Sequence, residues 1–294
     1  MELVYFIYPT CDGGCKHCWS SDILLGRYKS YDWHRRLIAT LENKRDLFSE
    51  VKISGGEPFL HPDIGKIVGA VQEHWGDDIP IKILTSGREF VSVKSGKIGI
   101  DETKDNILRF IPNLKNISIE MSADEYHLQS LASKNKWNVE EQKNNFKNYI
   151  SNFMLACFEL QSQNLFFKGP KLKIHCEEHR ANYHREELLS WIPDEWWEKN
   201  IILTEGLVYS GNAKKLSKTF KIKPSLQISY FLLPGVDFFE QPQTTLAQGF
   251  TKRNNMIYLD TCDDAAVLIS GWWNLIDRYA DYESIKISNG GNKL

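Results

Sequence analysis

Apolar segments of the chain alternate between the spacing of strands and the spacing of helices. Short runs with an apolar core, such as Leu3–Ile7 and Glu50–Ile53, predict strands. Longer segments, such as Trp33–Leu47 and Ile64–His74, carry apolar residues at helical spacing. Strands that alternate with helices along a chain are typical of an α/β fold with a parallel sheet. We therefore predict such a fold for this protein.

The same alternation continues through the first two thirds of the chain. Residues 88–104 are polar and contain glycine, so they predict a loop, with a short helical segment at 107–111. Further strands are predicted at Ile81–Leu84, Ile117–Ser122, Leu172–Cys176 and from Ile201, and further helices at Asn138–Leu160 and from Arg185 to Trp191. Six strand–helix units result.

The composition narrows the class of protein. The 294 residues are 42% hydrophobic, enough for one large domain or for a domain with an appendage. A net charge of −2 and a pI near 6.5 provide no basic field for nucleic acid. No apolar stretch is long enough to span a bilayer, and Met1 leads into the first strand without a signal peptide. Six cysteines are too few for a disulfide scaffold, which favours the reducing cytoplasm.

Three cysteines follow the first predicted strand. Cys11, Cys15 and Cys18 have the spacing C-x3-C-x2-C. An iron–sulfur cubane normally takes four cysteines, so a loop that supplies three leaves one iron open to a small molecule. Gly13 and Gly14 let the loop curl so that the sulfurs converge. The alternatives are a zinc site or unrelated buried cysteines, but no second Cys/His pair follows at the spacing usual for zinc.

Two other strands end in turns of small and polar residues. Residues 51–58 read Val-Lys-Ile-Ser-Gly-Gly-Glu-Pro, a strand followed by a Gly-Gly turn and the carboxylate of Glu57. Residues 83–87 end another strand in Thr-Ser-Gly. Active sites of parallel barrels lie at the carboxyl ends of the strands. All of these motifs are therefore expected at one edge of the sheet.

In these motifs the chain resembles the radical S-adenosylmethionine (SAM) superfamily, in the branch of molybdenum-cofactor and peptide-maturing enzymes. The resemblance covers about residues 1–215 and implies a partial (β/α)6 barrel with a small C-terminal extension. His17 occupies the place of an aromatic residue, and Ser86 stands where asparagine is common. The residues that match are Cys11, Cys15 and Cys18 for the cluster, and His17, Gly55, Gly56, Glu57, Pro58 and Ser86 for SAM.

The resemblance implies a [4Fe-4S] cluster and SAM as cofactors. Glu57 is expected near the SAM amine, where a carboxylate favours the ammonium. One electron from the reduced cluster cleaves the sulfonium, and the resulting 5′-deoxyadenosyl radical removes a hydrogen atom from the substrate. The cofactors carry the difficult chemistry while the protein positions them. An electron donor of flavodoxin or ferredoxin type is implied as a partner.

Further contacts with SAM are predicted at two places. Ser118, Glu120 and Ser122 alternate and so share one face of the fourth strand, where they either contact SAM or form an ordinary polar layer. Gly211 belongs to a small-residue turn that resembles the turn near adenine in the family. Asn212 replaces the arginine usual there, so only the proximity of the backbone is carried over.

Three residues are candidates for a catalytic role. His127 follows the fourth strand, where an imidazole could orient substrate or transfer a proton, or could be a structural histidine. Cys176 on the fifth strand and Cys262 near the C-terminus could each return a hydrogen atom to a substrate radical. A buried, unreactive cysteine is the alternative for both.

The chain is expected to divide into a barrel at residues 1–217 and an extension at 218–294. The extension resembles a reduced form of the cysteine-rich extension of peptide-maturing enzymes, which would lie near the substrate. The alternative is a small cap that only closes the barrel. The extension contains only Cys262, so no auxiliary cluster is expected. The leading hypothesis is an enzyme that modifies a ribosomally made peptide by crosslinking, epimerisation or another C–H modification. The alternatives are a radical SAM enzyme for a small molecule and a non-catalytic iron–sulfur or zinc-binding protein.

Overall fold

The computed structural model describes residues 2–8, 10–15, 18, 28–176, 190–205, 229–234 and 256–261. The strands are β1 (Glu2–Tyr8), β2 (Glu50–Gly55), β3 (Ile81–Thr85), β4 (Ile117–Ser122), β5 (Gly169–Cys176), β6 (Ile201–Glu205), β7 (Ser229–Pro234) and β8 (Met256–Thr261). The helices are α1 (Tyr31–Leu41), α2 (Ile64–Trp75), α3 (Gly96–Phe110), α4 (Glu125–Asn135), α5 (Val139–Gln163) and α7 (Asp194–Asn200). Two 3₁₀ turns are also present: η1 (Glu42–Leu47) follows α1, and η2 (Pro58–Leu60) follows β2.

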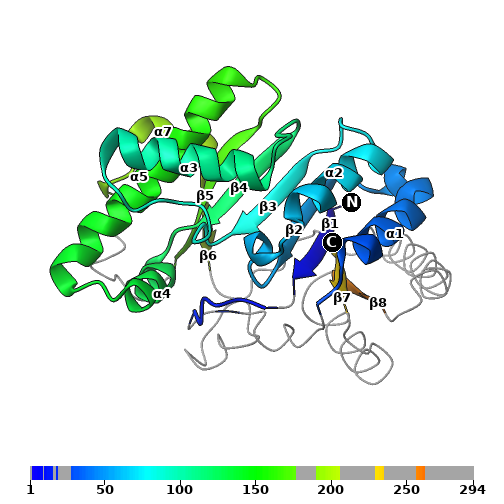
Figure 1. The fold of residues 1–294 in the computed structure, drawn as a ribbon, viewed down its shortest axis with the longest axis horizontal. Coiled ribbons are helices and arrows are strands. Elements are labelled where there is room, and N and C mark those ends of the chain that lie inside the picture. Colours follow the sequence, from blue (N-terminus) through cyan, green and yellow to red (C-terminus); the bar gives the residue numbers. More distant parts are fainter. Residues whose placement is uncertain are drawn as a thin grey trace, which may run out of the picture.

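The strands form one parallel sheet in the order β6-β5-β4-β3-β2-β1-β7-β8. The first six strands follow one another as in a partial barrel, which confirms the predicted α/β fold. The strands β7 and β8 lie beyond β1 and lengthen the same sheet. Figure 1 shows the strands pointing toward one edge, where the cysteine loop runs. Parallel pairing therefore brings the ends of β1, β2, β3 and β4 together.

Apolar packing between the sheet and its helices holds these ends in place. Ile81 and Ile83 alternate on β3 and are fully buried, as are Ile67 and Val71 on α2. A parallel sheet is normally buried on both faces, which agrees with the apolar runs in its strands. Figure 1 shows α1, α2, α3 and α5 arranged along the sheet.

One prediction of secondary structure was wrong. Much of the predicted loop at residues 88–104, and the short helical segment after it, belong to the fifteen-residue helix α3. Its buried stripe consists of Gly99, Thr103 and Ile107, at a spacing of four residues, and only Ile107 is large and apolar. The Thr103 hydroxyl is satisfied by the Gly99 carbonyl at 2.7 Å. Apolar periodicity does not reveal a helix whose buried face is small and polar.

Two other helical segments differ from the prediction. The helix predicted over 33–47 is α1 followed by the tighter turn η1, and Arg45 in that turn donates to the Trp75 carbonyl at 2.9 Å. The helix α4 was not predicted at all, because its amphipathic pattern is weak. Most of the helix predicted from residue 185 lies outside the described residues.

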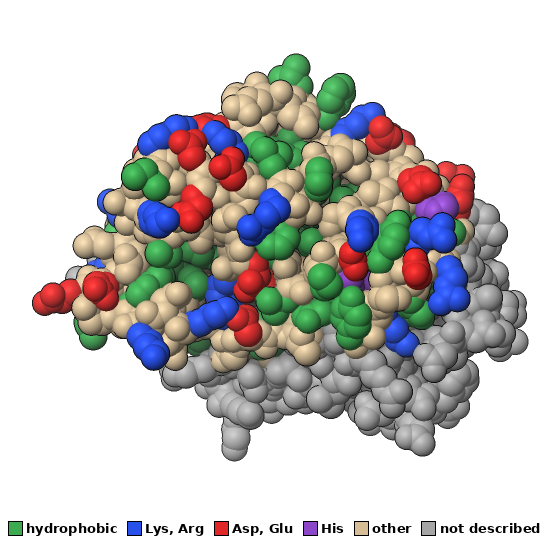
Figure 2. Space-filling model, in the orientation of Figure 1, with side chains coloured by type: hydrophobic (Ala, Val, Ile, Leu, Met, Phe, Trp, Pro, Cys, Tyr) green, Lys and Arg blue, Asp and Glu red, His purple; other side chains and the backbone are tan. Residues whose placement is uncertain are grey.

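Charges of both signs are mixed on the surface. Figure 2 shows acidic and basic side chains interspersed over the face in view. On α3 and α5 they form ion pairs, with Lys97 and Lys104 both contacting Asp101 and Glu159 at 2.6–3.0 Å. None of the described helices has the length and apolar character needed to cross a bilayer.

Candidate active site

The Gly-Gly-Glu turn after β2 lies directly against the start of the cysteine loop. The Gly56 amide donates to the Tyr8 carbonyl at 2.8 Å, and the Glu57 amide donates to the Thr10 carbonyl at 3.0 Å. A Cβ atom on Gly56 would lie 1.8 Å from the Thr10 carbonyl oxygen. Gly55 has φ of +135°, and a Cβ atom there would lie 2.5 Å from the Tyr8 carbonyl oxygen. The two motifs therefore form one unit, and only glycine permits this approach of two backbones.

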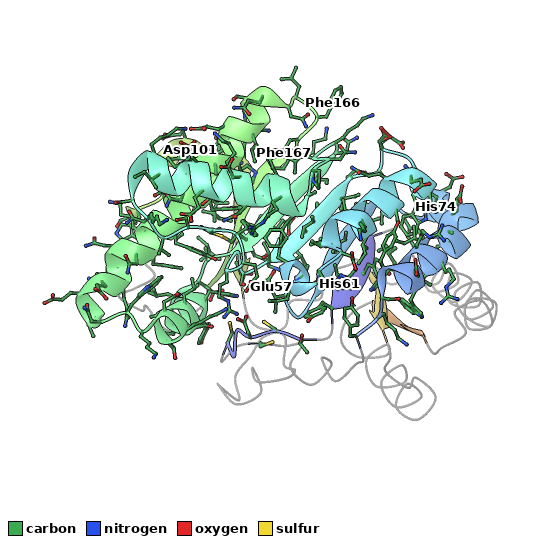
Figure 3. The ribbon with its side chains drawn as sticks, viewed as in Figure 1. Glu57, His61, His74, Asp101, Phe166 and Phe167 are labelled. Atoms are coloured by element: carbon green, nitrogen blue, oxygen red, sulfur yellow. The ribbon has the colours of Figure 1, made fainter. Side chains whose placement is uncertain are left out.

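The carboxylate of Glu57 ties this unit to the end of β3. Figure 3 shows Glu57 at the edge of the sheet beside the cysteine loop. Its Oε1 accepts from the Thr85 hydroxyl at 2.6 Å and the Phe59 amide at 3.3 Å. Its Oε2 accepts from the Ser86 hydroxyl at 2.5 Å and the Ser86 amide at 2.8 Å. The side chain is buried, and these four bonds use the acceptor positions that a carboxylate offers.

The Thr-Ser-Gly turn after β3 is fixed from two sides. On one side, the Ser86 amide donates to the Glu57 carboxylate. On the other side, the Tyr149 hydroxyl of α5 donates to the Ser86 carbonyl. Gly87 has φ of +78°, and a Cβ atom there would lie 2.6 Å from the Tyr149 hydroxyl oxygen. The hydroxyl of Thr85 accepts from the Gly87 amide at 2.8 Å. This turn is therefore rigid before any ligand binds.

One face of α4 holds the cysteine loop. His127, Ser130 and Lys134 are spaced three and four residues apart, so they share a side of the helix. The His127 ring bonds to the Cys15 sulfur, the Ser130 hydroxyl donates to the Gly13 carbonyl, and Lys134 pairs with Asp12. Three successive contacts therefore attach the loop to a helix that sequence analysis did not predict.

Asp124 organises the start of this helix. Its Oδ1 accepts from the backbone amides of Tyr126 and His127 at 3.0 and 3.1 Å, which caps α4. The same oxygen lies 2.9 Å from Nδ1 of the His127 ring. Burial alone would lower the pKa of His127, but the Asp124 carboxylate outweighs burial and raises that pKa to about 10. An imidazolium therefore faces the cysteine loop at neutral pH.

The electrostatic environment differs between two of the cysteines. Burial raises the pKa of the Cys11 thiol to about 11. Burial acts in the same direction on Cys15, but the hydrogen bond and the charge of His127 outweigh it, so the pKa of the Cys15 thiol is lowered. Cys11, Cys15 and Cys18 are all partly exposed and free of disulfides. The thiolate form, which binds metals, is thus favoured at Cys15.

Arg88 is a site residue that sequence analysis missed. It follows the Thr-Ser-Gly turn, and its guanidinium contacts Ser86, Cys11 and Asp12. Asp124 and Ser130 were missed as well. The signal available for Asp124 was an aspartate just before the first turn of a helix, which is a common N-cap pattern. Nothing in the sequence separates Arg88 from other charged loop residues.

The structure brings together some of the other predicted residues. Ser118 and Glu120 are buried on β4, and Ser122 ends that strand. Pro58 begins the turn η2 directly after Glu57, and Cys176 is the last residue of β5. His127 lies beside the cysteine loop, in contact with Cys15. The predicted residues His17, Gly211 and Cys262 lie outside the described part of the chain.

Comparison with solved structures finds several that match part of this chain at low identity. The crystal structure of Streptococcus suis SuiB bound to precursor peptide SuiA is 18% identical, with a TM-score of 0.43, over 93% of this chain and 51% of that one. The native anSMEcpe structure with bound AdoMet and Cp18Cys peptide is 14% identical, with a TM-score of 0.38, over 70% of this chain and 51% of that one. The chain thus spans about half the length of these proteins. No curated protein matches it.

The family assignment comes from the part of the sequence that contains the site. A profile of the radical SAM superfamily matches residues 5–155, just over half of the chain. This range includes the cysteine loop, the Gly-Gly-Glu turn, the Thr-Ser-Gly turn and the face of α4 described above. The chain therefore belongs to the radical SAM superfamily of enzymes.

Proposed function

We propose that Cys11, Cys15 and Cys18 hold a [4Fe-4S] cluster and that the surrounding strand ends bind SAM. One observation supports this most strongly. The cysteine loop lies against the Gly-Gly-Glu turn through two backbone hydrogen bonds, at the edge where the strands end. Radical SAM family membership implies both cofactors. The motifs that would hold them therefore lie side by side in the structure, although Ser86 comes 75 residues after Cys11 in the sequence.

The chemistry of the loop fits a cluster. Three partly exposed thiols lie on one loop, and the Cys18 amide closes a turn onto the Cys15 carbonyl at 3.1 Å. In the described residues no three Cys, His, Asp or Glu side chains converge as the ligands of a single metal ion do. In a cubane each cysteine binds a different iron, so separated sulfurs suit it better than a mononuclear ion.

When bound, the cluster and SAM supply one-electron cleavage of the sulfonium and a radical that removes a hydrogen atom from the substrate. The chain's own residues do the positioning. Glu57 has its acceptor positions filled by the protein, so it fixes the turns after β2 and β3. His127 favours the thiolate of Cys15. Ser86, Ser118, Glu120 and Ser122 remain predicted contacts of SAM.

We propose a peptide as the substrate. The motifs resemble those of the peptide-maturing branch, and the described strands form an open sheet with β6 and β8 as edges. An open sheet gives a long substrate lateral access to the strand ends. The proposed modification is a crosslink, an epimerisation or another change at a C–H bond, with Cys176 and Cys262 as candidate hydrogen donors. A flavodoxin or ferredoxin in a reducing cytoplasm is the proposed electron source.

The first experiment is an anaerobic reconstitution with iron and sulfide, followed by SAM and dithionite. We expect about four irons per chain and the release of 5′-deoxyadenosine, measured by mass spectrometry. Cys15→Ala should abolish the nucleoside and reduce the iron content. Cys157→Ala is the matched control, because Cys157 is a buried cysteine of α5 outside the loop. It should retain both iron and nucleoside.

The substrate class is tested with deuterated candidates. Transfer of deuterium from a peptide into 5′-deoxyadenosine would support the peptide proposal, and transfer only from a small molecule would overturn it. A wild-type protein that binds a full cluster but whose EPR signal does not respond to SAM would contradict the proposed cofactor site. If the metal bound by wild type and lost in Cys15→Ala were zinc and not iron, the proposed iron–sulfur cluster would be wrong.

A further inference from the structure

Arg88 is a buried cation placed on the cysteine loop. Its side chain is only 3% exposed. A Cβ atom on Gly13 would lie 2.2 Å from the guanidinium Nη2, so the absence of a side chain at Gly13 gives Arg88 its place. This close fit explains why a glycine stands between Cys11 and Cys15 without invoking a special backbone conformation there. The guanidinium and the loop are therefore shaped to each other.

The nitrogen atoms of the Arg88 guanidinium contact oxygen atoms of Ser86 and Asp12 and the sulfur atom of Cys11. Nε donates to the Ser86 hydroxyl at 3.2 Å, which in turn donates to Glu57. Nη2 lies 3.8 Å from the Cys11 sulfur and 3.4 Å from Asp12. Nη1 is buried and has no hydrogen-bond partner among the described residues. The Nε and Nη2 contacts thus hold the guanidinium in place, while Nη1 can still donate a hydrogen bond to an acceptor outside the described residues.

Carboxylates near Arg88 oppose its effect on the Cys11 sulfur without removing it, and Glu57 acts on the pKa of the Cys11 thiol more strongly than Arg88 does. Asp12 is 37% exposed and is shared with Lys134, which also lies 3.6 Å from Glu89. The guanidinium, in contrast, is withdrawn from water, and interactions of a buried charge are screened less than those of exposed ones. The Cys11 sulfur therefore lies close to the buried guanidinium of Arg88. Asp12, the carboxylate that pairs with this guanidinium, lies on the solvent side.

We propose that Arg88 raises the reduction potential of the cluster held by Cys11. The inference rests on the proposed function. Reduction adds one electron from a low-potential donor to the cluster and takes up no proton, so the charge of the site becomes more negative by one. A cation or N–H donor near a cluster sulfur stabilises the reduced form more than the oxidised form. Arg88 supplies both, and Nη1 offers a further donor to the sulfurs of the cluster.

The test is an EPR-monitored redox titration of the reconstituted protein without SAM. Arg88→Met keeps the volume of the side chain but removes its charge and donors. We expect it to shift the one-electron equilibrium toward the oxidised cluster at least tenfold, a midpoint lower by about 59 mV. Arg88→Lys should shift it less. Lys97→Met removes an exposed cation that pairs with Asp101 and Glu159, away from the cysteine loop, and should change the equilibrium less than threefold.

The outcomes separate this inference from the proposed function. A wild-type protein that assembles no cluster would overturn both. A cluster present in every variant, with the same midpoint in wild type and Arg88→Met, would overturn the role of Arg88 alone. If Arg88→Met does not fold, as judged by circular dichroism, the neutral variant Arg88→Gln takes its place. A midpoint equal to that of wild type in Arg88→Gln would contradict the proposal, because glutamine removes the charge of the guanidinium.

Discussion

Two buried histidines of this protein lie in opposite electrostatic states. His127 sits at the cysteine loop, where Asp124 raises its pKa to about 10. His34 on α1 is fully buried beneath β1, where burial, with a contribution from His61, lowers its pKa to about 3. Burial acts on both residues in the same direction, so the Asp124 carboxylate, with a smaller contribution from Cys15, makes the difference. One histidine is a cation at neutral pH and the other is neutral.

The surroundings of His34 explain its neutral state. The Tyr5 hydroxyl bonds to its Nδ1, and the rings of Tyr5, Trp33 and His61 pack edge-on against it. A hydroxyl and three rings provide a hydrogen bond and contact area but no negative charge. The comparison teaches that a carboxylate in contact with the ring, and not burial, decides which of these two histidines is charged. In the core under β1 an imidazole serves as a polar packing group.

The largest expected effect concerns the neutral histidine in acid. The pKa of His34 in the folded protein is below its unfolded value near 6.5, so the unfolded chain binds the proton first as the pH falls. The stability contributed by neutral His34 is full above pH 6.5 and is lost toward about pH 3. We expect wild type to lose about 1.4 kcal/mol per pH unit through this residue, or about 5 kcal/mol in all between pH 6.5 and pH 3. Urea unfolding from pH 7 to 4 measures the slope.

The variant His34→Gln isolates this contribution. Glutamine keeps an acceptor for the Tyr5 hydroxyl but does not titrate, so its stability should fall less steeply in acid than that of wild type. Parallel slopes for wild type and His34→Gln would show that His34 is accessible to protons in the folded state.

The second effect concerns the charged histidine. Asp124→Asn keeps a capping side chain on α4 but removes the charge beside His127, so the pKa of His127 should fall. A raised pKa contributes stability that is full below pH 6.5 and is lost as the pH rises through about 10. We therefore expect a loss of about 3 kcal/mol at pH 6.5 that disappears near pH 10. NMR titration of His127 and urea unfolding at both pH values measure it.

A second helix start provides the control for Asp124. Asp63 occupies the N-cap of α2, makes no side-chain capping bond there, and forms an ion pair with the exposed Lys66. Asp63→Asn applies the same chemical change and should cost about 0.5 kcal/mol or less. Equal losses in the two variants would mean that the charge beside His127 has no special value.

Several strands could be predicted from the sequence because their apolar residues recur at strand spacing. The strands predicted at Ile81–Leu84 and Ile117–Ser122 are present as β3 and β4, and in both the isoleucines occupy every second position. Helix α3 could not be predicted this way, because Gly99 and Thr103 fill most of its buried face. Local sequence patterns also cannot predict that β7 pairs with β1, since more than 220 residues separate the two strands.

The site was predictable only as far as it consists of contiguous motifs. The prediction of Gly55 and Gly56 rested on family resemblance, and the structure supplies the physical reason, a backbone contact with Tyr8 and Thr10. Arg88 gives no signal in the sequence, because its role depends on Cys11, 77 residues away. Contacts of this kind arise from tertiary packing, and neither composition nor periodicity carries them.

The smallest expected effect separates charge from neutral hydrogen bonding on α4. The Ser130 hydroxyl donates to the Gly13 carbonyl on the same helix face as His127. Ser130→Ala should therefore cost about 1 kcal/mol in urea unfolding, the usual value of one neutral hydrogen bond, and the cost should not vary between pH 6.5 and 10.

Ser133→Ala gives the matched control, because Ser133 lies on the exposed side of the same helix. It should leave stability unchanged or raise it slightly, since alanine favours helices more than serine does. A pH-independent loss at Ser130 beside a pH-dependent loss at Asp124 would show that two separable forces hold the cysteine loop. A loss at Ser130 that vanished near pH 10 would instead mean that the hydroxyl acts only through the charged His127, and that α4 holds the loop by charge alone.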